Sequence, residues 1–138
     1  MRAEAFRLHP GADLKQELQR LVAEHAFRAA CIVSCIGSLS SAGIRLAGAD
    51  STSEFEGPLE IISLAGTLAP DGVHAHICVA ASDGRCIGGH LGDGCIINTT
   101  AELVIGDHEV DVAGVSDRRD DEPRSEQRPH RSQCTVAT

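Results

Sequence analysis

The stretch VHAHICVAASDGRCIGGHL, from Val73 to Leu91, holds three of the seven histidines of the chain. Its two apolar runs, with the segment ASDGR between them, are typical of a β-hairpin. Side chains alternate between the two faces of a strand, so His74 and His76 must point to the same face. The position of His90 depends on how the turn pairs the second strand with the first.

The turn ASDGR allows two registers. The Ser-Asp pair suits a type I turn, and Gly84 suits the left-handed position of a three-residue loop with a bulge. That loop puts His90 directly opposite His76 and diagonal to His74, so that all three imidazoles share one face. A two-residue Asp-Gly loop would shift the pairing by one residue and send His90 to the opposite face. The convergence of the three histidines therefore depends on the turn type.

Three converging imidazoles predict a site for one divalent cation. Opposed residues in a sheet have Cβ atoms about 5 Å apart, from which imidazole nitrogens can reach a cation at about 2.0–2.1 Å. Zn²⁺ is the first candidate, with its fourth position open for water or an acid, and Fe²⁺, Ni²⁺ or Cu²⁺ accept the same ligands. The alternative is three independent polar residues on a solvated face, which is the weaker interpretation for histidines in this arrangement.

Several other residues bear on this site. Glu60 and Glu102 are candidates for a further ligand or an acid–base group, although a carboxylate in such a position more often has a structural role. Gly88 and Gly89 precede His90, and their missing side chains leave space for a ligand or for another backbone. The remaining histidines are expected to be structural or at the surface: His9, His25, His108 and His130.

The rest of the sequence predicts an α+β fold, a single domain with a mainly antiparallel β-sheet and one amphipathic helix packed on it. The segment EAFRLHPG is typical of a short strand that ends at a turn. The helix is expected from about Asp13 to His25, because leucines recur there at helical spacing and Asp13 with Gln16 has the spacing of a capping box. Further strands are expected over residues 30–37, 42–47, 59–68, 73–81, 85–91 and 101–105.

Composition and charge restrict the classes of function. The 138 residues suffice for one domain with its own core, and no apolar run approaches the roughly 18 residues of a membrane span. No secretory signal is evident, so the cytoplasm is the expected location and no membrane is expected as a partner. The net charge of −8 repels phosphate backbones, and three Phe without Tyr or Trp offer few stacking platforms. Strong binding of nucleic acid by the isolated chain is therefore disfavoured.

The cysteines are expected to be reduced thiols that act as small apolar residues. Five of the six lie in apolar runs, and no C-x-x-C pair occurs. A thiolate metal site is not expected.

The C-terminal region differs from the rest of the chain. Residues 1–106 are expected to form the domain, whereas residues 107–138 are expected to be a divergent final segment and a polar, disordered tail. The tail contains SDRRDDEPRSEQRPHRSQ, in which arginines are matched by acids. It is therefore a mixed-charge segment rather than a basic arm.

The family that this sequence resembles is the PPC domain, the plants-and-prokaryotes conserved domain. The resemblance extends from about Phe6 to Gly106 and rests on four segments: RLHPGADLKQEL, CIVSCIGSLSSAGIRLA, EGPLEIISLAGTLAPDGVHAHICVAASDGRCIGGHL and TTAELVIG. It implies a single antiparallel sheet with a helix, a homotrimer and, as in prokaryotic members, a metal on the residues that match His74, His76 and His90. Plant relatives join the domain to AT-hooks that bind A/T-rich minor grooves, and stand-alone bacterial members are commonly labelled DNA-binding for that reason.

The sequence departs from the family in two places. It has no R-G-R-P core, since Arg128-Pro129 lacks the flanking Arg-Gly, so the DNA-contacting element of the plant proteins is missing. After Gly106 the usual final strand is replaced by DHEVDVAGVSDRRDDEP. A more distant similarity in fold is to acetolactate decarboxylase, which also binds zinc through an H-x-H pair and a later histidine.

Two functions follow from these observations. The first is a homotrimeric, metal-binding PPC-domain protein that serves as a DNA-associated or transcription-associated regulatory module, with protein partners and with weak or no autonomous DNA binding. The alternative is a zinc-dependent enzyme that acts on a small carbonyl or carboxylate substrate, with the metal as Lewis acid or activator of water. The first is preferred because no nucleophile–base pair and no phosphate-binding glycine motif accompanies the histidines.

Overall fold

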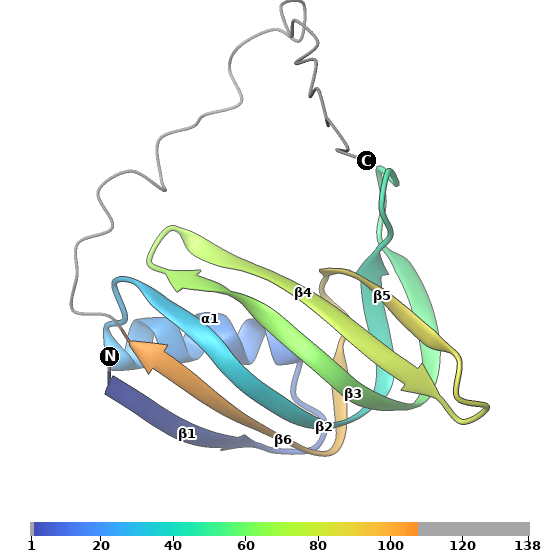
Figure 1. Cartoon of the computed structure of the whole chain (residues 1–138), viewed down its shortest axis with the longest axis horizontal. Helices are drawn as coiled ribbons and strands as arrows, with labels where there is room; N and C mark the ends of the chain where they lie inside the picture. Colours follow the sequence, from blue (N-terminus) through green and yellow to red (C-terminus); the bar gives the residue numbers. More distant parts are fainter. Residues whose placement is uncertain (1, 108–138) are drawn as a thin grey trace, which may run out of the picture.

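The structure is a computed structural model of the chain, and it describes residues 2–107. Its elements follow in the order β1 (Arg2–Leu8), α1 (Leu14–His25), β2 (Ala30–Arg45), β3 (Ser53–Ala69), β4 (Gly72–Ala81), β5 (Cys86–Leu91) and β6 (Ile96–Asp107). The strands form one antiparallel sheet in the order β1-β6-β2-β3-β4-β5, and α1 covers one of its faces (Figure 1). The predicted α+β class is confirmed.

The helix α1 begins and ends as its sequence predicts. The Asp13 carboxylate accepts hydrogen bonds from the backbone N–H groups of Lys15 and Gln16, which have no partner within the first turn of a helix. The apolar side of the helix packs on the sheet with four buried residues: Leu14, Leu18, Leu21 and Val22. At 12 residues, α1 is too short to cross a membrane, and no other helix occurs within residues 2–107.

The core lies between α1 and the sheet face that α1 covers. It includes Phe27 after the helix, Ile77 and Val79 of β4, and Leu103 and Ile105 of β6, each 2% exposed or less. Along β4, residues that point toward α1 are buried and their neighbours are more exposed. The exposed residues of β4, which include the first two histidines of the hairpin, therefore lie on the face that α1 leaves uncovered.

Two expectations about the strands were wrong. The segments 30–37 and 42–47 form one strand, β2, because the intervening residues keep pairing with β3 on one side and β6 on the other through register shifts between Gly37 and Ser41. The sequence GSLSS suggested a turn there, but these pairings override the local preference. Strands β3 and β6 also begin earlier than expected, at Ser53 and Ile96. The expected tail lies outside the described residues, apart from Asp107.

The sheet curls so that β5 meets β2 as well as β4. In this contact Arg45 lies opposite His90, and the N–H of Gly92 donates to the carbonyl oxygen of Gly43 at 2.9 Å. Gly89 makes the approach possible, because a Cβ at this position would lie 2.5 Å from the carbonyl oxygen of Arg45. The expectation that the glycine pair leaves room for another backbone is confirmed at Gly89.

Gly89→Ala is predicted to destabilise the protein by about 1–3 kcal/mol, because the added methyl group forces β5 away from β2. The matched control is Gly88→Ala, whose Cβ would lie 3.2 Å from the carbonyl oxygen of Ile77 on the open face. We expect the control to lose less than half as much free energy of unfolding, measured by urea denaturation. Equal losses of free energy of unfolding in the two variants would show that the contact of Gly89 with β2 is no tighter than the contact of Gly88 with β4.

Candidate metal centre

The turn between β4 and β5 is a three-residue loop. The N–H of Gly84 donates to the carbonyl oxygen of Ala81 at 2.8 Å, and the N–H of Ala81 donates to the carbonyl oxygen of Arg85 at 2.9 Å. Gly84 has a φ of 83°, in the left-handed region that favours glycine. The resulting register pairs His76 with His90. Of the two registers that the sequence allows, the one that brings the histidines together is confirmed.

The three imidazoles lie against one another on the uncovered face of the sheet. Ring centroids are 5.3 Å apart for His74 and His76, 5.3 Å for His74 and His90, and 5.7 Å for His76 and His90. One ligand atom from each ring lies within 4.8 Å of the other two. Nitrogens bound to one tetrahedral cation at about 2.0–2.1 Å would be about 3.3 Å apart. Small side-chain rotations would therefore suffice to bring three nitrogens onto one ion.

The environment of His90 favours the form that binds a metal. Burial lowers its pKa, and the positive charge of Arg45 and the neighbouring imidazoles lower the pKa further. A lowered pKa keeps the imidazole neutral, and only the neutral ring can donate to a cation. In addition, the Nδ1 atom of His90 is buried and has no hydrogen-bond partner within the described residues. Such an atom costs free energy until a ligand satisfies it, so the donor set fits a metal ion.

The two acidic residues considered as further ligands, Glu60 and Glu102, lie outside the histidine cluster. Glu102 lies on β6 opposite Ile36, away from the end of β2 that meets β5, and its carboxylate binds Arg7 at an N···O distance of 3.0 Å. Glu60 is exposed on β3. It pairs with Ala80 of β4, which lies closer to the β4–β5 turn than His74 and His76 do. Neither belongs to the group of side chains that can meet at one ion. These carboxylates therefore have no place among the predicted ligands.

The remaining histidines that the structure describes also lie apart from the cluster. The Nδ1 atom of His25 is 3.3 Å from a carboxylate oxygen of Glu4, and its ring stacks on Phe27 with centroids 5.4 Å apart. His9 is exposed after β1. The structural or surface role expected for these two agrees with their positions, whereas His108 and His130 lie outside the described residues.

The cysteines take no part in the cluster. The five that the structure describes are free, and Cys35 and Cys95 are buried in the core. Burial raises the pKa of each of these two thiols to about 11, which makes them poor nucleophiles and poor ligands. Among residues 2–107, the one group of side chains placed to share an ion consists of histidines alone.

Arg45 is the residue beside the site that the sequence did not predict. It belongs to β2, about 45 positions from His90 along the chain, and reaches the cluster only through the β2–β5 contact. In the sequence, the glycine pair before His90 indicated that another backbone lies close to β5, but it did not indicate which strand that backbone belongs to.

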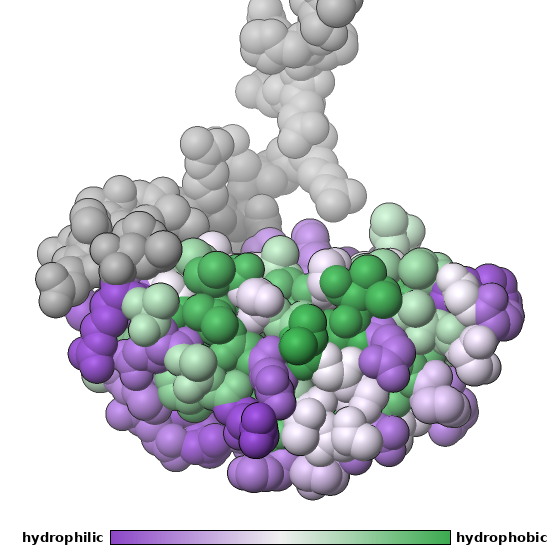
Figure 2. Space-filling view, turned by 60° about the horizontal axis from the view of Figure 1, so that its bottom comes forward, coloured by the Kyte–Doolittle hydropathy of each residue, from purple (hydrophilic) through white to green (hydrophobic). Residues whose placement is uncertain are grey.

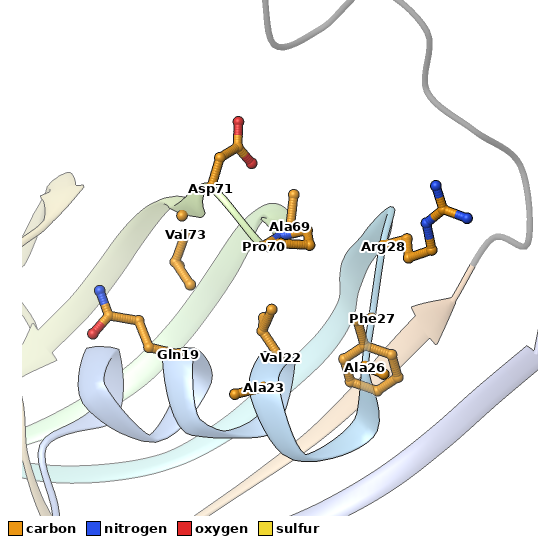
Figure 3. Close-up of a pocket in the computed structure, with 11 residues that line it drawn as sticks. Gln19, Val22, Ala23, Ala26, Phe27, Arg28, Ala69, Pro70, Asp71 and Val73 are labelled. Carbon is orange, nitrogen blue, oxygen red and sulfur yellow. The ribbon is translucent and has the colours of Figure 1, made fainter.

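A groove on the other side of the sheet is a separate feature. It lies between the C-terminal end of α1 and the β3–β4 turn, and its apolar lining comes from Val22, Phe27, Pro70 and Val73 (Figure 3). The side chain of Val73 points into the groove, while that of Asp71 points away from the helix (Figure 3). Because successive residues of β4 face opposite sides, the groove and the histidines cannot share a ligand.

The sequence model of the Plants and Prokaryotes Conserved (PCC) domain, also abbreviated PPC, matches residues 1–109. The chain belongs to this family.

Curated relatives carry the same domain within longer proteins. The chain is 49% identical over 109 residues to the bifunctional protein GlmU of Synechococcus sp. (strain JA-3-3Ab), a match that covers 78% of this chain and 17% of GlmU. It is 28% identical over 121 residues to AT-hook motif nuclear-localized protein 14 of Arabidopsis thaliana, covering 80% of this chain and 29% of that protein. The chain thus spans less than a third of the length of either relative.

Solved structures share the fold over most of its length. A hypothetical protein from Salmonella enterica is 42% identical with a TM-score of 0.75, covering 77% of each chain. A metal-containing protein from Archaeoglobus fulgidus is 29% identical with a TM-score of 0.61, covering 76% of this chain and 78% of the other. A Staphylococcus aureus protein of unknown function, similar to α-acetolactate decarboxylase, shares the fold at 16% identity with a TM-score of 0.54, covering 79% and 54%.

Proposed function

We propose that the chain is a metal-binding, homotrimeric regulatory module of the PCC family, with one divalent cation on His74, His76 and His90. The observation that carries the proposal is that these three side chains can each bring a ligand atom within 4.8 Å of the others. The metal-containing relative from Archaeoglobus fulgidus supports it. Three neutral imidazoles suit Zn²⁺ first, and the ion would supply Lewis acidity and positive charge on the uncovered face of the sheet.

Purified wild-type protein is predicted to contain about one divalent cation per chain. His76→Ala removes one of the three ligands, and we expect it to retain less than about a tenth of the metal, since two imidazoles hold a cation far more weakly than three. The control is His9→Ala, which changes an exposed histidine outside the cluster. The measurement is elemental analysis by mass spectrometry after dialysis. Full metal content in His76→Ala would contradict the proposed ligands.

The association of copies is proposed from apolar side chains exposed on the uncovered face, and the number three is what the family resemblance implies. Val33, Ile36 and Ile62 are 54%, 61% and 57% exposed, and we call these three residues the outer apolar patch. Gly37 pairs with Ile61, so Ile36 and Ile62 are neighbours across β2 and β3. Figure 2 shows apolar residues gathered over a broad part of the surface, with polar residues around them. A patch of this kind is what a second copy of the chain would cover.

Ile62→Glu is predicted to convert the trimer to a monomer, because it places a charge in the middle of an apolar contact. Light scattering coupled to size-exclusion chromatography should give about three times 14.5 kDa for the wild type and 14.5 kDa for the variant. The control is Leu46→Glu, at an exposed apolar residue in the β2–β3 loop, which should remain a trimer. A monomeric wild type at micromolar concentration would overturn this part of the proposal.

Association with DNA is proposed to depend on a partner. The relative from Arabidopsis thaliana is an AT-hook motif protein, but this chain lacks the R-G-R-P sequence through which an AT-hook inserts arginine into the minor groove. The net charge of −8 also opposes approach to phosphates. The isolated chain is therefore expected to bind duplex DNA weakly or not at all.

The predicted dissociation constant for duplex DNA is above 1 μM at about 150 mM salt, in the range of non-specific binding. A fluorescence-anisotropy titration at several salt concentrations, with A/T-rich and G/C-rich duplexes, measures it. Sub-micromolar affinity that weakens steeply as salt rises would show that assembly creates a basic surface, and would reject this part of the proposal.

A metal-dependent enzyme is the second candidate function. One observation favours it: the site offers three protein ligands, as catalytic zinc sites do, whereas structural zinc sites have four. The substrate would be a small carbonyl or carboxylate compound, polarised by the cation. Among the described residues, no serine, threonine or cysteine side chain is hydrogen-bonded to a histidine, so the regulatory module remains the preferred function.

A further inference from the structure

Arg45 places a positive charge at the edge of the histidine cluster. It lies directly opposite His90 in the β2–β5 contact, so both side chains leave the same face of the sheet. Arg45 is exposed. Opposed residues of neighbouring strands have Cβ atoms about 5 Å apart, so the long side chain of Arg45 can bring its guanidinium beside the imidazole of His90.

Arg45 has no anionic partner within residues 2–107. Four other arginines each bind a carboxylate of the chain: Arg2, Arg7, Arg20 and Arg85. Lys15 also contributes to the lowered pKa of His90, but its ammonium group is 3.3 Å from a carboxylate oxygen of Asp93. The net charge of −8 means that carboxylates are abundant in the chain, yet none of those described pairs with Arg45. Its guanidinium, beside three imidazoles, is therefore available to bind an anion from solution.

We propose that Arg45, together with the cation held by the three histidines, binds the carboxylate group of a small organic anion. This inference rests on the proposed metal site. Three protein ligands leave one position of a tetrahedral cation for an outside ligand. The forked guanidinium matches a carboxylate in shape and charge, which gives the site a preference for planar carboxylates over neutral molecules.

The surroundings of the cluster suit a small ligand. Gly88 lies opposite Cys78 on the same face as His90, and a residue without a side chain leaves the surface next to the imidazole open. A nucleic-acid backbone would need several cations in a row, whereas Arg45 is a single one. The chemical class of ligand is therefore a small carboxylate rather than a polyanion.

The test uses the full chain loaded with Co²⁺, which replaces Zn²⁺ and has visible absorption bands that respond to its ligands. Acetate is titrated at constant ionic strength, with acetamide as the neutral ligand of similar shape. We expect saturable binding of acetate and none of acetamide. Arg45→Gln should weaken acetate binding by about tenfold or more, and Arg45→Lys should fall between that variant and the wild type.

The matched control is Arg85→Gln. Arg85 belongs to the same hairpin, but it binds Asp83 at the turn with an N···O distance of 2.6 Å. This control should bind acetate as the wild type does. Equal acetate affinity of wild type and Arg45→Gln, with Co²⁺ bound to both, would overturn the role of Arg45 alone. Failure of the wild type to bind Co²⁺ would overturn the metal site and, with it, this inference.

Discussion

The three-residue turn from Ser82 to Gly84 sets the register of β4 and β5, and the histidine cluster depends on that register. Gly84 occupies the left-handed conformation that closes this turn, with a φ of 83°. A shift of one residue would exchange the two faces of β5 and turn His90 toward the buried side of the sheet, where Ile77 and Val79 lie. The left-handed conformation of one glycine thus determines whether the three histidines lie on one face of the sheet.

The close approach of β5 to β2 is the second constraint. Backbone contacts at Gly89 leave no room for a side chain, and they fix the end of β2 beside the hairpin. This contact gives the site its asymmetry: His90 is partly buried and next to Arg45, whereas His74 and His76 are exposed. The cluster therefore has one positively charged side, and the proposed binding of an anion depends on that charge.

The local parts of the structure could be predicted from the sequence, and the non-local parts could not. The helix and the hairpin follow from spacing and turn chemistry within about twenty residues, which left two registers for the hairpin, one of them with His76 opposite His90. The continuity of β2 was missed, because Gly37 to Ser41 has the composition of a turn and is held extended by strands on both sides. Arg45 was missed for the same reason, since only the curl of the sheet brings it to His90.

X-ray absorption spectroscopy of the zinc-loaded protein tests the central claim, a cation bound by three imidazoles, most directly. The account predicts a first shell of nitrogen or oxygen atoms at about 2.0–2.1 Å, with the outer-shell scattering of about three imidazole rings and no sulfur. A first shell with sulfur at about 2.3 Å would assign the ion to the cysteines and contradict the account. A shell of oxygen atoms without imidazole scattering would contradict it equally.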